Sequence, residues 1–341
     1  MNTKRILIIS PLPLRPVKSG MQNTIYLLSK FLREKKHKVI FYNIKTNNKI
    51  DPILNLKKKE LIKIEIKKKI NLKKIDLIFV NTTKILFQYK SILLSKHRDF
   101  KTILVCHDLY YFRKKYFDQI NIKDKTEFKF SNEINILKKT DYIIDFSKKE
   151  HEYLLKKKIQ KKKLIKTNTP TICFKKVDIL DKKKYDMLYI ASDWFQNHLS
   201  LNNFLDEVNN KKIRFEYLVL GDLSLKSKSS VNVKPYAVGM FKKCKIGIAM
   251  MKNSTGRKTK IFEMMSAGLP VFTNINLKEF GLRNNYHYKY FDKKKQLVHQ
   301  LKLFLLNINL RKKISNNAFK WSKKNTFYQK AFIKLNKKIL R

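Results

Sequence analysis

RILIISPLPLRPVKSGMQNTIYLLSKFLREKKHKVIFYNI, residues 5–44, is the stretch that decides the fold. Its two ends are short apolar runs typical of buried strands, and its middle carries apolar residues at helical spacing. That helical face consists of Ile25, Leu28, Phe31 and Leu32. A strand, a loop, a helix and a second strand in this order form the βαβ unit from which parallel sheets are built.

The same alternation continues to the end of the chain. Further strands are predicted at 75–81, 101–108, 141–147, 185–192, 215–222, 231–236, 245–251 and 269–274, with an alternating edge strand at 61–67. Helices are predicted at 200–210, at 258–267 and in a long run from 293 to 340. A Lys-rich stretch at 154–170 interrupts the alternation before it restarts. We therefore expect an α/β protein of two doubly wound, Rossmann-like domains.

The expected boundary between these domains follows the Lys-rich stretch, with a first domain at 1–170 and a second that begins at 171. A length of 341 residues agrees with two domains. Parallel sheets bind ligands beyond the carboxyl ends of their strands. Two such domains facing each other would line a central cleft with those ends, so a site is expected in the loops there.

The strong positive charge has a compositional explanation. The chain has 78 Lys and Arg against 26 Asp and Glu, a formal net charge of +52, spread over its whole length and accompanied by many Ile and Asn. An AT-rich coding sequence would produce this bias. No helix-turn-helix, zinc-finger or RNP pattern is present, so no specific nucleic-acid partner is expected, and nucleic-acid binding stays an alternative prompted by charge alone. An apolar fraction of 43% excludes a disordered basic tail.

The cysteines and the hydropathy pattern indicate a cytoplasmic protein. Cys106, Cys173 and Cys244 are odd in number and far apart, which suits neither a disulfide framework nor a zinc site. No apolar run approaches the ~18 residues that a membrane span needs. The N-terminal apolar run is interpreted as a strand and not as a signal peptide, because prolines interrupt it and no small-residue cleavage site follows.

Two loops in the first half carry candidate site residues. Ser19 and Gly20 precede the first helix, where a glycine lets backbone N–H groups approach a phosphate. His107 and Asp108 end the strand predicted at 101–108 and are placed for proton transfer or for hydrogen bonding to a substrate hydroxyl. An ordinary turn and a capped, solvated loop are the alternative interpretations.

KNSTGRKTKIFEMMSAGLPVFTN, residues 252–274, is the most informative stretch of the second half. Its loop and first helical turn contain Gly256, Arg257, Lys258 and Lys260. Because a helix N-terminus is already positive, three cations there indicate an anionic guest such as a diphosphate. Glu263 lies one turn further on and could accept two hydrogen bonds from a ribose diol. The alternative is a solvated helix with a Lys–Glu pair.

Together these features resemble the GT-B glycosyltransferases of the group 1, or family 4, type, over nearly the whole chain. Residues 5–42 resemble the family's first strand, glycine loop, helix and second strand, and KTILVCHD (101–108) resembles the strand that ends in a histidine near the donor sugar. TGRKTKIFEMMSAGLPVFTNINLKEFGL (255–282) resembles the donor-binding loop and helix and is the most specific match. The terminal residues 317–340 resemble the helix that closes such chains.

The resemblance implies a GT-B fold with an acceptor-side domain at 1–170, a nucleotide-sugar donor domain at 171–325 and a terminal helix at 326–341 that packs back toward the first domain. It implies transfer of a sugar from a nucleotide sugar to a glycan or lipid-linked acceptor, with retention at the anomeric carbon. The nucleotide sugar is a co-substrate, so no cofactor is expected. No metal is expected either, because cations would neutralise the diphosphate and no Asp-x-Asp motif is present.

The resemblance also assigns roles to single residues. Glu263 matches the family's ribose-binding glutamate, and Lys258, with Lys260 nearby, matches basic residues that face the diphosphate. Ser19 and Gly20 match the loop of the first domain that touches the phosphates, although Ser19 replaces a usual glycine.

Two departures and one surface property keep alternatives open. Thr255 stands where many members carry an acidic residue, eight positions before Glu263. Together with Ser19 it leaves open a degenerate GT-B protein that binds a nucleotide or glycan without catalysis; a sugar-nucleotide epimerase is a further alternative. The Lys-rich stretches 56–74 and 154–166 are candidates for peripheral attachment to the anionic inner face of the cytoplasmic membrane, in surface polysaccharide or glycolipid synthesis.

Overall fold

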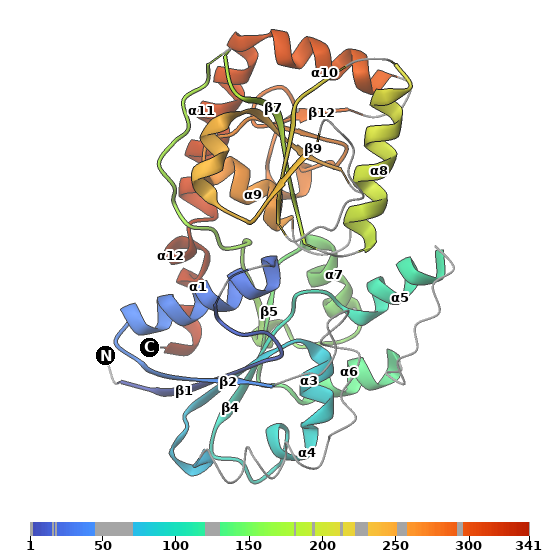
Figure 1. Ribbon diagram of the computed structural model, residues 1–341. Coiled ribbons are helices and arrows are strands. Elements are labelled where there is room, and N and C mark those ends of the chain that lie inside the picture. Colours follow the sequence, from blue (N-terminus) through green and yellow to red (C-terminus); the bar gives the residue numbers. More distant parts are fainter. Residues whose placement is uncertain are drawn as a thin grey trace.

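The computed structural model describes residues 3–15, 17, 19–44, 71–119, 130–180, 182–192, 195–211, 214–221, 231–250, 258–291 and 296–340. These residues form two α/β units, one above the other in Figure 1, each built on a six-stranded parallel sheet. The doubly wound two-domain fold expected from the sequence is therefore confirmed. The edge strand predicted at 61–67 lies outside the described residues.

The first sheet has the order β2-β1-β3-β4-β5-β6. Its strands are β1 (Arg5–Ser10), β2 (Lys38–Asn43), β3 (Leu77–Asn81), β4 (Lys101–Val105), β5 (Tyr142–Asp145) and β6 (Leu164–Lys166). The chain moves outward from β1 to β2 and then returns across β1 to β3. This reversal makes the carboxyl ends of β1 and β3 the switch point of the sheet, where doubly wound folds bind ligands.

Helices cover both faces of this sheet. They are α1 (Gly20–Glu34), α3 (Thr83–Gln88), α4 (Lys90–Leu93), α5 (Tyr110–Gln119), α6 (Phe130–Lys139) and α7 (Lys148–Lys156). The helix α1 buries its predicted apolar face against β1, β3 and β4. It begins where Ser19 Oγ accepts a hydrogen bond from the Gln22 backbone N–H, which is a typical N-cap.

The second sheet has the order β12-β11-β10-β7-β8-β9. Its strands are β7 (Tyr185–Ala191), β8 (Tyr217–Gly221), β9 (Val231–Lys234), β10 (Cys244–Ala249), β11 (Val271–Thr273) and β12 (Lys289–Tyr290). Its helices are α8 (Phe195–Asn209), α9 (Thr259–Ser266), α10 (Leu297–Leu306) and α11 (Ile308–Asn325). The switch point lies between β7 and β10, and α9 begins close to it.

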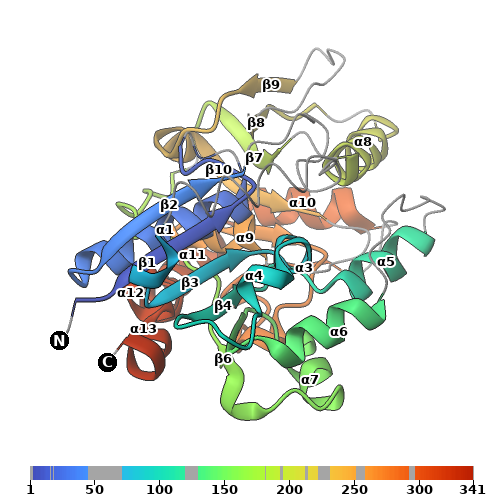
Figure 2. The ribbon, with the colours of Figure 1, turned by 90° about the horizontal axis from the view of Figure 1, so that it is seen from below.

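The end of the chain returns to the first sheet. After α11 come the short helices α12 (Tyr328–Ala331) and α13 (Ile333–Leu335) and a π-helical turn at Asn336–Leu340. Tyr328, Phe332 and Leu335 share one apolar core with α1 and β1, and the terminal helices lie beside them in Figure 2. Tyr328 Oη also donates to Glu34 Oε1 at 2.6 Å.

Two chain crossings connect the domains, and they run side by side. The Thr171 backbone N–H donates to the Thr326 carbonyl oxygen at 2.7 Å, and the Tyr328 N–H donates to the Thr171 carbonyl oxygen at 3.0 Å. The two threonine hydroxyl groups are also hydrogen-bonded, at 3.0 Å. These paired crossings are the connection between the two sheets and are called the hinge below.

Two strands and two helix breaks differ from the sequence prediction. The strands β6 and β12 were not predicted, because β6 has only two apolar residues among lysines and β12 has only two residues in all. The predicted helical run at 293–340 is broken at Asn307, whose side-chain Oδ1 caps α11 by accepting the Leu310 N–H at 2.8 Å. It is broken again at Thr326, where the chain crosses back to the first domain.

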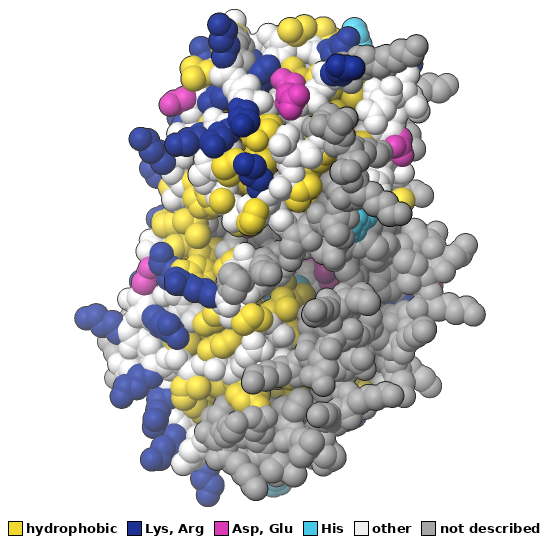
Figure 3. Space-filling view, in the orientation of Figure 1, with side chains coloured by type: hydrophobic (Ala, Val, Ile, Leu, Met, Phe, Trp, Pro, Cys, Tyr) yellow, Lys and Arg dark blue, Asp and Glu magenta, His cyan; other side chains and the backbone are white. Residues whose placement is uncertain are grey.

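On the face shown in Figure 3, Lys and Arg side chains are spread along both domains and acidic side chains are sparse. This distribution agrees with a bias of composition. No helix in the described ranges is long and apolar enough to cross a membrane.

Candidate functional site

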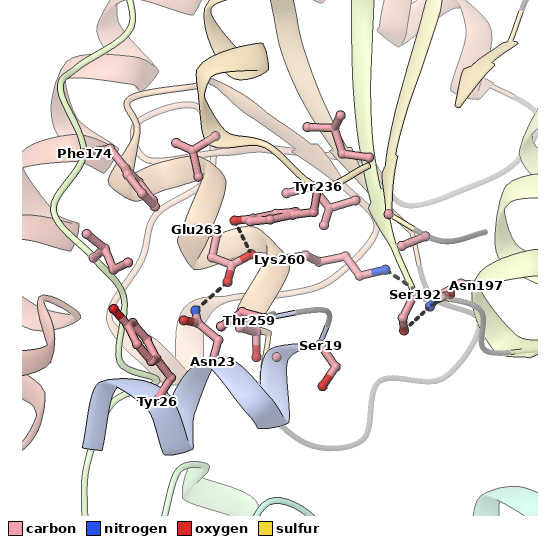
Figure 4. A pocket seen from close by; sticks show the side chains of 18 residues that line it. Ser19, Asn23, Tyr26, Phe174, Ser192, Asn197, Tyr236, Thr259, Lys260 and Glu263 are labelled. Carbon is pink, nitrogen blue, oxygen red and sulfur yellow. Dashed lines mark hydrogen bonds between the residues drawn. The ribbon is translucent and has the colours of Figure 1, made fainter. Parts of the chain in front are cut away.

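A pocket of about 260 Å³ lies between the two domains. The first domain contributes the start of α1, and the hinge contributes Ile172 and Phe174. The second domain contributes the ends of β7 and β8, Tyr236, and one side of α9. Figure 4 shows polar groups from both domains converging on this space.

The N-termini of α1 and α9 meet at the pocket. A Cβ at Gly20 would lie 2.7 Å from Thr259 Oγ1, so only glycine allows the two helices to approach so closely. Helix N-termini present free backbone N–H groups and a positive dipole end, which favours anions. Ser19, Gly20 and Thr259 line the pocket beside these two helix ends.

Glu263 is buried on α9 and faces the pocket (Figure 4). Its Oε1 accepts a hydrogen bond from Asn23 Nδ2 at 2.7 Å, and its Oε2 accepts one from Tyr236 Oη at 3.4 Å. Burial raises the pKa of this carboxyl to about 7, while the two hydrogen bonds and the charge of Lys260 partly oppose the rise. The carboxylate keeps unused lone pairs, so it can also accept hydrogen bonds from the hydroxyl groups of a ligand.

Lys260 extends along the other end of the pocket. Its Nζ donates to Asn197 Oδ1 at 2.9 Å and lies 4.8 Å from the ring centre of Tyr189. Asn197 is itself held by the Ser192 carbonyl oxygen, to which its Nδ2 donates at 2.9 Å. Burial lowers the pKa of Lys260 to about 8. An anion in the pocket would therefore favour the charged form of this side chain.

Lys258 lies at the N-terminus of α9 and is only 2% exposed. Burial lowers its pKa to about 8, and carboxylates of both domains oppose the shift, namely Glu279 of its own domain and Asp108 and Glu150 of the first. It is therefore a buried cation at the domain boundary.

His107 belongs to a hydrogen-bonded chain at the switch point of the first sheet. Its Nε2 is hydrogen-bonded to Asn81 Oδ1, which can only accept, and Asn81 Nδ2 donates to Ser10 Oγ at 2.9 Å. The imidazole also stacks on the Phe146 ring, with 6.2 Å between ring centres. The side chains at the ends of β1 and β3 thus fix the orientation of the imidazole.

Three carboxyl groups gather at the carboxyl edge of the first sheet. Glu150 Oε1 accepts the Leu109 N–H at 3.2 Å, beside Asp108, and its Oε2 accepts from Ser147 Oγ at 3.0 Å. Burial, and then the charge of Asp108, raise the pKa of Glu150 well above its ordinary value. Glu133 is fully buried, and its carboxylate accepts two backbone N–H groups at the start of α5. Burial raises its pKa to about 7.

The structure brings most of the predicted residues to one boundary. Ser19, Gly20, Lys260 and Glu263 line the pocket itself. Lys258 lies at the N-terminus of α9, within the electrostatic influence of Asp108. His107 follows β4 of the first sheet. Gly256 and Arg257 fall outside the described residues.

Four further residues of the site were not predicted. Asn23, Tyr236 and Asn81 make their contacts with residues far away in sequence, so no local pattern marks them. Glu150 has a local signal, because it follows Ser147 at the spacing of a capping box, with mutual hydrogen bonds. Among the described residues, no group of three or more His, Cys, Asp and Glu could hold a metal ion.

The chain is similar to a family model in part of its sequence and to solved structures over its whole fold. Residues 66–168 match the model of the N-terminal domain of glucosyltransferase 3-like proteins. No curated protein sequence matches the chain. Among solved structures, sucrose-phosphate synthase from Thermosynechococcus elongatus superposes with a TM-score of 0.77 at 13% identity over 98% of each chain. HepE from Anabaena, in complex with UDP and glucose, superposes with a TM-score of 0.70 at 10% identity over 99% of each chain.

A glycosyltransferase from Rickettsia africae adds a third likeness, with a TM-score of 0.63 at 17% identity over the full length of both chains. At these identities the likeness establishes the fold. All three superpositions extend over both sheets and the boundary between them. The resemblance in the sequence is confirmed at this level: the chain has the GT-B fold, two Rossmann-like domains that face each other across a common boundary.

Proposed function

We propose that this protein is a glycosyltransferase that uses a UDP-sugar as donor. The observation that carries the proposal is the start of α9: Lys260 and Glu263 line the pocket against the N-terminus of α1, and the N-cap residue Lys258 is buried at the domain boundary. A buried carboxylate beside a buried and a half-buried cation matches the two chemical parts of a nucleoside diphosphate, the ribose diol and the diphosphate. The structures of HepE with UDP and with UDP-glucose support the choice of base.

The residues have separate tasks in the proposed reaction. Lys258, Lys260 and the two helix N-termini stabilise the negative charge that develops on the leaving UDP, which is the electrostatic part of catalysis. Glu263 holds the ribose. The apolar part of the pocket, with Tyr236 and Phe174, accommodates the base.

The first domain supplies the acceptor side. Asp108 and His107 follow β4 at the opposite wall of the boundary, and in the proposal they hydrogen-bond to an acceptor hydroxyl or to the transferring sugar. The acceptor is a glycan or a lipid-linked glycan, and the product is a surface polysaccharide or glycolipid. Transfer with retention and without a metal completes the proposal, because the cations of α9 take the part that a metal would play.

The test combines binding with turnover. A stabilising ligand raises the melting temperature by mass action, so UDP and UDP-sugars should stabilise the protein more than ADP, GDP or UMP do. Lys260→Met and Glu263→Ala should each remove most of this shift, whereas Lys278→Met, which changes an exposed lysine of the same domain, should keep it. Stabilisation by UDP-sugars without release of UDP in the presence of any acceptor would favour the binding protein without catalysis. No stabilisation by any nucleotide would refute the proposal.

Peripheral membrane attachment is proposed for the basic end of α7 and the turn that follows it. Lys156, Lys158, Lys161 and Lys162 are exposed there, and each Lys near an anionic leaflet contributes about 1 kcal/mol. The candidate stretch 56–74 lies mostly outside the described residues. Flotation with vesicles of anionic lipid should carry the protein upward, and changing these four lysines to Gln should prevent it. Equal flotation with neutral vesicles would contradict the attachment.

A further inference from the structure

The hydrogen bond between Asn23 and Glu263 joins the two domains inside the pocket. Asn23 lies in the first turn of α1, and Glu263 lies in the middle of α9, 240 positions further along the chain. Both side chains are buried, with 7% of each exposed, and the distance from Nδ2 to Oε1 is 2.7 Å. A short hydrogen bond from an amide to a buried carboxyl is among the stronger polar contacts in proteins.

The position of this contact relative to the hinge makes it sensitive to domain opening. The hinge crossings at Thr171 and Thr326 contribute one wall of the pocket through Ile172, and Asn23 approaches from α1. The close contact of Gly20 with Thr259 adjoins it. A rotation about the hinge that separated α1 from α9 would break both contacts, while the hydrogen bonds of the hinge would remain.

The contact also determines how Glu263 is presented. Asn23 holds one carboxylate oxygen and Tyr236, from the same domain as Glu263, holds the other. Two partners fix the plane of the carboxylate, and each oxygen retains a lone pair that points elsewhere. A ribose diol would therefore find its acceptor group already oriented, but only while the domains are closed.

We propose that Asn23 is a positioning residue that couples domain closure to donor binding: its hydrogen bond to Glu263 is a latch that holds the domains together and orients the carboxylate for the ribose. This inference rests on the proposed nucleotide-sugar site. A protein whose competent state is only partly populated binds its ligand more weakly by that fraction, so loss of the latch weakens UDP binding while Glu263 and the lysines of α9 are all retained.

The experiment measures compactness and affinity on the same variants. Small-angle scattering gives the radius of gyration with and without UDP, and calorimetry gives the dissociation constant. In Asn23→Leu, which removes the donor, the radius without UDP should increase, UDP should bind about ten- to a hundredfold more weakly, and saturating UDP should restore the wild-type radius. In Glu263→Gln, whose amide oxygen can still accept from Asn23, the radius should stay as in the wild type while UDP binding weakens.

A double variant distinguishes loss of the hydrogen bond from misfolding of Asn23→Leu. The double variant Asn23→Asp with Glu263→Gln reverses donor and acceptor, so it should restore the compact radius of the wild type but not its affinity for UDP. An unchanged radius for Asn23→Leu overturns the latch, and so does an increased radius with wild-type affinity for UDP. A wild-type protein that does not bind UDP overturns the proposed donor site instead, and the radius of Asn23→Leu then decides the domain contact by itself.

Discussion

The carboxyl edges of the two sheets carry opposite charges. At the edge of the first sheet the carboxyls Glu133 and Glu150 are buried, with Asp108 beside them. At the start of α9 in the second domain the ammonium groups of the buried Lys258 and the half-buried Lys260 precede Glu263. The net charge of +52 does not reveal that the two edges differ in charge. The difference comes from the positions of a few groups.

The two edges therefore suit different parts of one reaction. The cationic edge favours a leaving diphosphate, and the acidic edge favours hydrogen bonds to neutral hydroxyl groups of an acceptor. Burial favours the neutral form of each group on both edges. It raises the pKa of the carboxyl Glu133 and lowers the pKa values of Lys258 and Lys260. The variants below are chosen to separate the two edges.

The largest expected effect comes from the acidic edge. Asp108→Asn should lower the rate of sugar transfer by about a hundredfold or more, because it removes the carboxylate that the proposal assigns to the acceptor. Affinity for UDP should change by less than about threefold, since the proposal places the nucleotide at α9. Steady-state kinetics and calorimetry measure the two effects. Asp118→Asn, an exposed change on α5, should leave both unaffected. A large loss of UDP affinity in Asp108→Asn would contradict the division.

The cationic edge should show the converse. Lys260→Met should weaken UDP binding by about ten- to a hundredfold, because a charge-assisted contact with the diphosphate is lost. The effect on UMP, which has one phosphate fewer, should be smaller. Competition calorimetry with the two nucleotides measures this ratio. An equal loss for UDP and UMP would place the lysine away from the diphosphate.

The third prediction concerns stability, where the buried carboxyls and the lysines of α9 act in opposite pH ranges. Glu133 and Glu263 have pKa values near 7 in the folded protein against 4.5 ordinarily, so the folded state binds more protons between these values and stability falls as pH rises through that range. Lys258 and Lys260 have pKa values near 8 against 10.5, so the unfolded state binds more protons above pH 8 and stability rises again. Each such group contributes a slope of about 1.4 kcal/mol per pH unit.

Denaturant unfolding from pH 4.5 to 10 should therefore show a minimum between pH 7 and 8. Glu133→Gln should flatten the acidic limb. Lys260→Met should flatten the alkaline limb and extend the acidic limb to higher pH, because the charge of Lys260 opposes the rise in the pKa of Glu263. If Glu133→Gln altered the alkaline limb instead, the assignment of the acidic slope to the buried carboxyls would be wrong.

Features of the fold and of the candidate site could be predicted from the sequence where they depend on residues close together in the chain. Features that depend on contacts between distant residues could not. The βαβ alternation and the cations of α9 are local patterns, so the fold and Lys258, Lys260 and Glu263 were accessible to sequence reasoning. The strand β6 could not be predicted in this way. Leu164 and Ile165 are too short an apolar run to indicate a strand, and β6 forms through its pairing with β5.

The acidic edge and the contact across the boundary were largely invisible for the same reason. Glu133 caps α5 from α6, and Asn23 meets its partner only after both domains have folded. Side chains whose partners lie on other elements leave no periodic signal. Sequence reasoning therefore identified the polar residues of α9 more completely than the carboxyls of the first sheet's edge and their partners.

Calorimetry of UDP binding at pH 8, in two buffers with different ionisation enthalpies, tests the central claim most directly. Lys258 and Lys260 are only partly protonated there, and a diphosphate between them would raise both pKa values. The account predicts that UDP binds with net uptake of protons and that Lys258→Met and Lys260→Met each reduce this uptake. Binding of UDP without proton uptake, or uptake that survives in both variants, would contradict it.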